Sequence, residues 1–113
     1  MGLSELVRAE LVLVAPSATT DEEIISQLAA RLTAQGFARP SLAAAVIERE
    51  RSHPTGLVLD AAGGNAAIPH ADPGHVVLPA VAVGVLATPV DFKRMDAPAE
   101  VIPVRLVLLL ALA

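Results

Sequence analysis

The first half of the chain combines one short apolar run with two amphipathic stretches. Glu10–Ala15 is rich in Leu and Val and is followed by a proline, which predicts a first strand. Thr20–Glu23 then matches a capping box, and apolar residues at helical spacing follow it. Gly36 is a stop signal for this helix. A second helix is expected over residues 42–51, because Pro54 prevents the helix from continuing.

The second half contains two short apolar segments and two long ones. Residues 57–59 and 66–68 predict brief strands. Pro79–Leu86 and Val104–Leu112 are nearly continuous apolar runs, a pattern typical of strands buried on both faces. The polar residues 91–100 between them predict a connection. Because strands and helices alternate, we expect an α/β fold, a single domain in which a mixed, mostly parallel sheet has helices on both faces.

The chain stops inside the last apolar run, at Ala113. No helix follows that could cover the sheet, and a parallel sheet with an uncovered face is rare. We therefore expect one domain over residues 1–113 that is truncated at its C-terminus, where helices are missing.

The composition excludes several classes of protein. A net charge of −4, with only two aromatic residues, argues against nucleic acid as a partner, which requires a basic surface and often aromatic stacking. The chain has no cysteine and so forms no disulfide or thiolate metal site, which fits a reducing compartment. The apolar runs are too short or too interrupted for membrane insertion, which needs about 20 apolar residues. We therefore expect a cytoplasmic protein.

Ile68-Pro69-His70 is the motif most indicative of chemistry. A neutral imidazole is a nucleophile near pH 7, whereas Ser or Lys needs activation by its surroundings. The proline restricts its own φ and favours an extended conformation in the residue before it. The motif therefore predicts a strand end that presents one imidazole in a fixed direction. The alternative is an exposed and inert loop histidine.

Polar and glycine residues upstream of this histidine could form an anion site with it. Gly63 and Gly64 would let backbone N–H groups approach an anion, although most such pairs are simply turns. The side chains of Thr55 and Asn65 could donate hydrogen bonds to the same place.

Arg49 falls on the apolar stripe of the second predicted helix, three residues after Val46 and seven after Leu42. An inward arginine needs an anion, because an unpaired buried charge is strongly unfavourable. The anion could be a phosphate, which suits the planar guanidinium. A structural salt bridge or a snorkelling side chain would also explain the position.

His53 and His75 flank His70 in the sequence and raise the question of a metal site. Zinc could be bound by His70, Asp72 and His75, but their spacing does not match a common ligand pattern. Hydrolysis by a Ser/His/Asp triad is also poorly supported, because the chain has no G-x-S-x-G motif.

Two stretches together carry a resemblance to a known family. Glu48–Leu57 reads Glu-Arg-Glu-Arg-Ser-His-Pro-Thr-Gly-Leu, and Ala66–Asp72 reads Ala-Ala-Ile-Pro-His-Ala-Asp. They resemble the IIA component of the bacterial sugar phosphotransferase system (PTS), in the fructose/mannitol superfamily. Its hallmark is an Arg-Glu pair, then Ser/Thr-Gly, then Gly-Ile-Ala-Ile-Pro-His. The His-Pro-Thr-Gly-Leu segment and His75-Val76 are most similar to the galactitol-type branch. The resemblance covers nearly the whole chain.

The resemblance implies that the protein is a phosphotransferase. Its histidine would accept a phosphoryl group from the histidine phosphocarrier protein (HPr) and pass it to a IIB component for sugar uptake, with no cofactor or metal. His70 matches the phosphorylated histidine, and Arg49 matches the arginine that assists at the phosphate. Further expected site residues are Thr55, Gly64 and Asn65 as phosphate ligands, with His53 and His75 as auxiliary groups.

The sequence departs from the family pattern at two points and leaves alternatives open. The family continues beyond its last strand as C-terminal helices, which we expect to be missing here. Asn65-Ala66 stands where the family has Gly-Ile, which affects the shape of the loop. A regulatory phosphoacceptor domain that controls other proteins, or a small metal- or ligand-binding domain, would also fit. The sequence does not indicate which imidazole nitrogen reacts.

Overall fold

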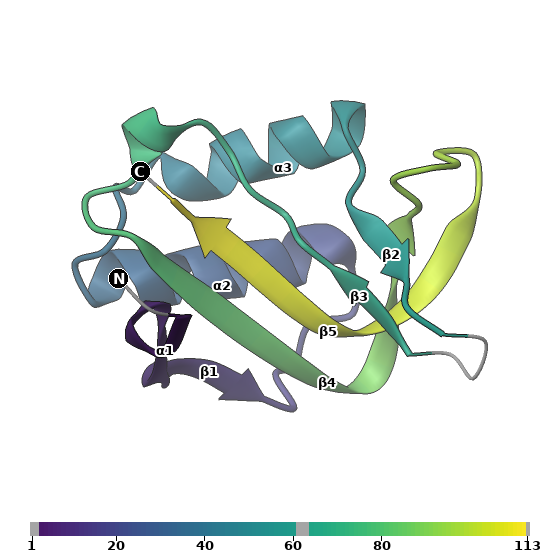
Figure 1. Cartoon of the computed structure of the whole chain (residues 1–113), viewed down its shortest axis with the longest axis horizontal. Helices are drawn as coiled ribbons and strands as arrows, with labels where there is room; N and C mark the ends of the chain where they lie inside the picture. Colours follow the sequence, from purple (N-terminus) through teal and green to yellow (C-terminus); the bar gives the residue numbers. More distant parts are fainter. Residues whose placement is uncertain (1–2, 61–63, 113) are drawn as a thin grey trace.

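A five-stranded sheet with the strand order β1-β4-β5-β3-β2 forms the centre of the protein (Figure 1). The computed structural model describes residues 3–60 and 64–112. All predicted helices and strands are present, and α1 is an element that the sequence pattern did not indicate. Along the chain, the elements are α1 (Leu3–Leu6), β1 (Val7–Val14), α2 (Asp21–Ala34), α3 (Leu42–Ser52), β2 (Gly56–Val58), β3 (Asn65–Ala67), the 3-10 helix η1 (Pro73–His75), β4 (Ala80–Lys93) and β5 (Val101–Ala111).

The sheet is mixed, as predicted, but it is half parallel rather than mostly parallel. β1 pairs with β4 and β3 with β5 in parallel, whereas β4 with β5 and β2 with β3 are antiparallel. The difference arises because β4 continues to Lys93, so that only residues 94–100 connect it to β5. A connection this short joins antiparallel neighbours, since a parallel pair needs a crossover of about a dozen residues or more.

Local signals begin and end α2 where the sequence predicts. The Thr20 hydroxyl accepts a hydrogen bond of 3.1 Å from the backbone N–H of Glu23, one of the free donors at the helix N-terminus. Gly36 has a φ of +84°, in the left-handed region that favours glycine, and turns the chain out of the helix. No helix in the described part of the chain is long and apolar enough to cross a membrane.

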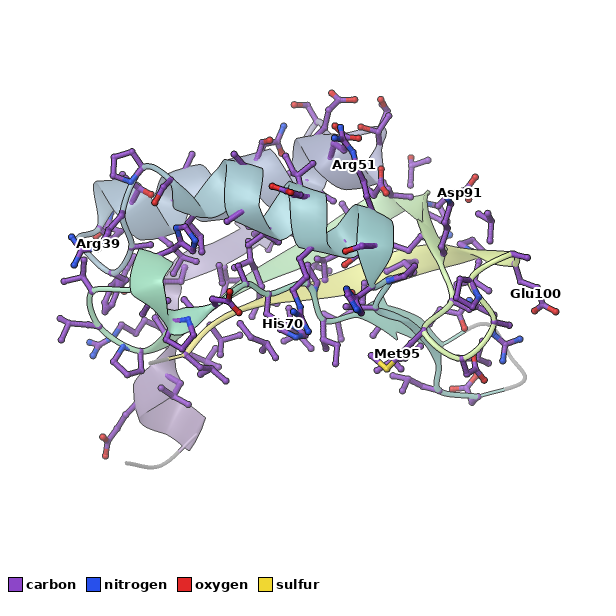
Figure 2. The ribbon with its side chains drawn as sticks, turned by 90° about the horizontal axis from the view of Figure 1, so that it is seen from above. Arg39, Arg51, His70, Asp91, Met95 and Glu100 are labelled. Carbon is purple, nitrogen blue, oxygen red and sulfur yellow. The ribbon has the colours of Figure 1, made fainter. Side chains whose placement is uncertain are left out.

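Both long helices, α2 and α3, pack on the same face of the sheet (Figure 2). A glycine in β4 makes the close approach of α2 feasible, because a Cβ atom at Gly84 would lie 3.0 Å from Ile24 Cδ1. The sequence predicts helices on both faces, and of the described helices only the short α1 lies on the other side (Figure 2). Strand pairing places Val83 and Leu108 next to each other on that second face.

Candidate functional site

The segment that follows β3 holds His70 in a defined orientation. The backbone N–H of Ile68 donates to Thr55 Oγ1 at 3.2 Å, and the N–H of Leu110 donates to the carbonyl of Pro69 at 3.0 Å. The ring atom Nδ1 of His70 lies 2.8 Å from the carbonyl oxygen of Ile68. A carbonyl can only accept a hydrogen bond, so Nδ1 carries the proton. In the neutral ring Nε2 then has the free lone pair.

Glu50 connects this segment to α3. Its two carboxylate oxygens accept hydrogen bonds of 2.8 Å from the backbone N–H and the hydroxyl of Thr55. Glu50 is 6% exposed and Thr55 3% exposed. Burial raises the pKa of the Glu50 carboxyl above its ordinary value, and the Thr55 hydrogen bonds oppose that shift. Charge interactions act in both directions, because Asp21 raises the Glu50 pKa and His70 lowers it.

Arg49 lies in a pocket of about 320 Å³ between α3 and the chain that follows His70. Its Nε atom is buried and has no hydrogen-bond partner among the described residues. It also forms no ion pair within residues 3–60 and 64–112. The structural salt bridge considered from the sequence is therefore not formed there. The pocket is lined by Ala45, Glu48, Arg49, Ser52, His53, Ala71, Asp72 and His75.

The two other histidines lie at the same pocket as Arg49. His53 is exposed at the end of α3, with Nδ1 3.0 Å from Ser52 Oγ, and His75 is half-buried, with Nδ1 2.8 Å from Ser41 Oγ. Ala71, which also lines the pocket, directly follows His70. The fold thus gathers Arg49, His53 and His75 at one pocket, and His70 directly precedes a residue of its wall. No group of three or more His, Asp or Glu residues that could hold a metal ion occurs in the part of the chain that the structure describes.

Two of the predicted phosphate ligands lie at the wrong end of β3. Asn65 begins the strand, and its Nδ2 donates to the carbonyl of Pro103 at 2.9 Å. Gly64 precedes it and donates from its N–H to Asp60 at 3.1 Å. Because an extended chain rises about 3.3 Å per residue, Asn65 lies roughly 16 Å from His70. A loop that appears close in sequence is therefore distant in space. Gly63 lies outside the described residues.

Thr55 is in the right region but its donors are already engaged. Its N–H and its hydroxyl both donate to Glu50, and its Oγ1 accepts from Ile68. The expectation that Thr55 donates to a phosphate does not agree with these contacts. They indicate instead that the threonine supports the segment that carries His70.

Sequence reasoning missed Glu50, although a signal for it was present. The residues of α3 with the lowest exposure are Leu42, Val46 and Glu50, which recur at intervals of four. This period places one acid on the buried face of the helix. Arg49, which the same helix phase had placed inward, is only half-buried. The neighbouring glutamate is therefore the more deeply buried charge.

Comparison with protein families identifies the domain. The family model described as "Phosphoenolpyruvate-dependent sugar phosphotransferase system, EIIA 2" matches residues 5–113. The chain belongs to this EIIA type 2 family. The resemblance noted in the sequence is therefore confirmed at the level of the EIIA family, and a role in phosphoryl transfer follows in general terms. No curated protein sequence gives a significant match.

Solved structures show the same EIIA fold. IIA mannitol from Escherichia coli is 25% identical with a TM-score of 0.75, and the match covers 93% of this chain and 70% of that one. A complex of enzyme IIA mannitol with phosphorylated enzyme IIB mannitol from the same organism matches at 24% identity, TM-score 0.76, over 95% and 72% of the two chains. Nitrogen regulatory protein IIA-Ntr from Neisseria meningitidis matches at 22%, TM-score 0.67, over 96% and 68%. The single α/β domain with a mixed sheet is thus confirmed.

Proposed function

We propose that this EIIA domain relays a phosphoryl group through Nε2 of His70. The group comes from the histidine phosphocarrier protein and goes to a IIB component that serves sugar uptake. The observation that carries the proposal is the 2.8 Å contact between His70 Nδ1 and the Ile68 carbonyl, which leaves the lone pair on Nε2. The structure of IIA mannitol in complex with phosphorylated IIB mannitol supports a IIB protein as partner. The domain acts in the cytoplasm.

The reaction is a substitution at phosphorus between two imidazoles. The Nε2 lone pair of His70 attacks the phosphorus atom of the phosphorylated carrier, and a new N–P bond forms. The N–P bond of the carrier breaks, and its electron pair stays on the nitrogen of the carrier imidazole. The Nδ1 proton of His70 remains in its hydrogen bond to Ile68 throughout. A second substitution of the same kind then transfers the group to an acceptor side chain of the IIB component.

Arg49 neutralises the charge of the phosphoryl group. Transfer of this kind depends on positioning and electrostatic stabilisation of the equatorial oxygens more than on covalent help. The unpartnered Nε of Arg49 is a donor that an anion can satisfy, and desolvation inside the pocket strengthens the interaction. His53 and His75 supply further donors from the wall of the same pocket.

The direct test is phosphorylation with phosphoenolpyruvate, the first enzyme of the system and the carrier, followed by mass measurement and site mapping. Wild-type protein should gain one phosphoryl group on His70, and His70→Ala should gain none. Arg49→Ala should slow transfer by about a hundredfold, the range seen when one charge-stabilising donor is removed. The matched control Arg105→Ala removes an exposed arginine and should leave the rate unchanged. Labelling of His70→Ala at the wild-type rate would refute the assignment.

A second candidate is a regulatory phosphoacceptor that controls other proteins, because the fold also matches nitrogen regulatory protein IIA-Ntr. Both functions use the phosphorylated His70, so the acceptor distinguishes them. Transfer from phosphorylated wild-type protein to a IIB component encoded beside it would support sugar uptake, and retention of the group would support regulation. The galactitol-type branch indicated by the sequence stays a prediction.

A further inference from the structure

Glu50 is a buried acid that the phosphoryl relay leaves without a role. It does not line the pocket that contains Arg49, and its carboxylate is occupied by Thr55. Its position is unusual because a buried carboxylate is desolvated, which disfavours its charged form. A buried acid at this position requires an explanation. Its hydrogen bonds connect it through Thr55 to the segment that carries His70.

We propose that Glu50 is a positioning residue that holds His70 in the Nδ1–H tautomer through Thr55 and Ile68. The inference rests on the proposed function, since it concerns the nitrogen that reacts there. Glu50 touches neither the phosphoryl group nor the reacting ring, so its action is indirect.

Three consecutive hydrogen bonds form a chain from Glu50 to His70. The Thr55 hydroxyl donates to Glu50 Oε1 at 2.8 Å, so its proton points to the carboxylate. The same oxygen then presents a lone pair to the Ile68 N–H at 3.2 Å. Ile68, anchored by this bond, offers its carbonyl to Nδ1 of His70 at 2.8 Å. The Leu110 N–H holds the adjoining Pro69 carbonyl at 3.0 Å, so both neighbouring peptide groups are restrained.

This hydrogen-bond chain requires an acceptor with two oxygens at position 50. Two donors of Thr55, its N–H and its hydroxyl, converge on Glu50, and an ionised carboxylate accepts both. A glutamine has one acceptor oxygen and one NH₂ group. The NH₂ group would face the hydroxyl and reverse its direction. The Thr55 hydroxyl proton would then point toward the Ile68 N–H, and the hydrogen bond between the two groups would be lost. The Ile68 carbonyl would be less firmly positioned as a result.

The tautomer of His70 can be read from the ¹⁵N chemical shifts of its ring. In the neutral His70 ring of the wild-type protein, Nδ1 should be protonated and Nε2 unprotonated. Glu50→Gln should increase the Nε2–H population and lower kcat of phosphorylation by about tenfold, while KM for the carrier stays unchanged. The control Glu10→Gln makes the same change at an exposed glutamate and should alter neither quantity. A role in stability alone would not move the tautomer in a folded variant.

A second pair of variants covers the case in which Glu50→Gln fails to fold. Thr55→Val keeps the shape of the side chain but removes the hydroxyl, and should shift the tautomer and kcat as Glu50→Gln does. Thr55→Ser keeps the hydroxyl and should restore both. Wild-type ring shifts that show a dominant Nε2–H form would overturn the proposal without any variant, as would unchanged shifts in folded Glu50→Gln or Thr55→Val.

The outcomes also distinguish this positioning role from the proposed phosphoryl-transfer function. Wild-type protein that takes up no phosphoryl group, but whose tautomer responds to Glu50→Gln, would refute the function and leave the positioning intact. Wild-type protein that is phosphorylated on His70, with a tautomer that ignores both Glu50→Gln and Thr55→Val, would refute the positioning alone.

Discussion

Replacement of Gly56 by alanine tests how closely β2 approaches the end of β4. A Cβ atom at Gly56 would lie 2.6 Å from the carbonyl oxygen of Lys93 and 3.3 Å from Ile102 Cδ1. The first of these neighbours is backbone, so it cannot rotate away as a flexible side chain would. The Met95 N–H also donates to the Gly56 carbonyl at 2.9 Å, which ties the two segments together.

The loss of stability can be estimated from how far β2 and Lys93 must move apart. Ordinary contact begins near 3.4 Å, so the methyl group requires a movement of 3.4 − 2.6 = 0.8 Å between β2 and Lys93. Overpacking of this kind costs about 1–3 kcal/mol of stability. Alanine also restricts the unfolded chain, which offsets about 0.4–1 kcal/mol. Gly74→Ala is the matched control, because a Cβ atom there has no neighbour within 4 Å. The difference between the two variants isolates the steric contact.

Urea unfolding followed by far-ultraviolet circular dichroism is the suitable assay, since the chain has no Trp or Tyr to report by fluorescence. Gly56→Ala should lower the unfolding free energy by about 1–3 kcal/mol relative to Gly74→Ala. It should also slow phosphorylation, because Thr55 directly precedes Gly56, the first residue of the strand that must move. A difference within about 0.5 kcal/mol between the variants, the range of neutral surface changes, would refute the close approach.

Three further variants test other parts of the structure. Thr20→Ala should destabilise the protein by about 1 kcal/mol in thermal unfolding, because the Glu23 N–H loses its cap; an unchanged midpoint would contradict that role. Leu28→Ala should lower the unfolding free energy by about 2–5 kcal/mol, since the side chain is fully buried; a change below about 1 kcal/mol would mean that α2 packs loosely. Burial raises the Glu50 pKa above 4.5, so the stability linked to this group is present below that pH and lost as pH rises through the folded pKa. As the pH rises from 4.5 through the folded pKa of Glu50, the unfolding free energy of wild type relative to Glu50→Gln should therefore decline in urea titrations at several pH values. Parallel pH curves for the two proteins would disprove this linkage.

The local parts of the fold were predictable because their causes lie close together in sequence. A capping threonine and a left-handed glycine define the ends of α2 without help from the rest of the chain. Nearly continuous apolar runs likewise indicated β4 and β5. The direction of their pairing was less accessible, because it depended on how far β4 extends into the polar segment after Val90.

The functional site was likewise predictable only where its causes lie close together in sequence. The Pro69-His70 pair and the inward Arg49 could be inferred from sequence, since proline geometry and helical spacing are short-range properties. The position of Asn65 could not, because only an extended strand carries it to the far end of the sheet.

The sequence by itself determined which residues can react and which local elements present them. The tertiary structure alone decided which of these residues meet. The Ile68 carbonyl meets Nδ1 of His70 because hydrogen bonds from Thr55 and Leu110 restrain the backbone on both sides. The Thr55–Ile68 and Leu110–Pro69 hydrogen bonds join segments far apart in the chain, and their geometry is set only when the sheet and helices pack together.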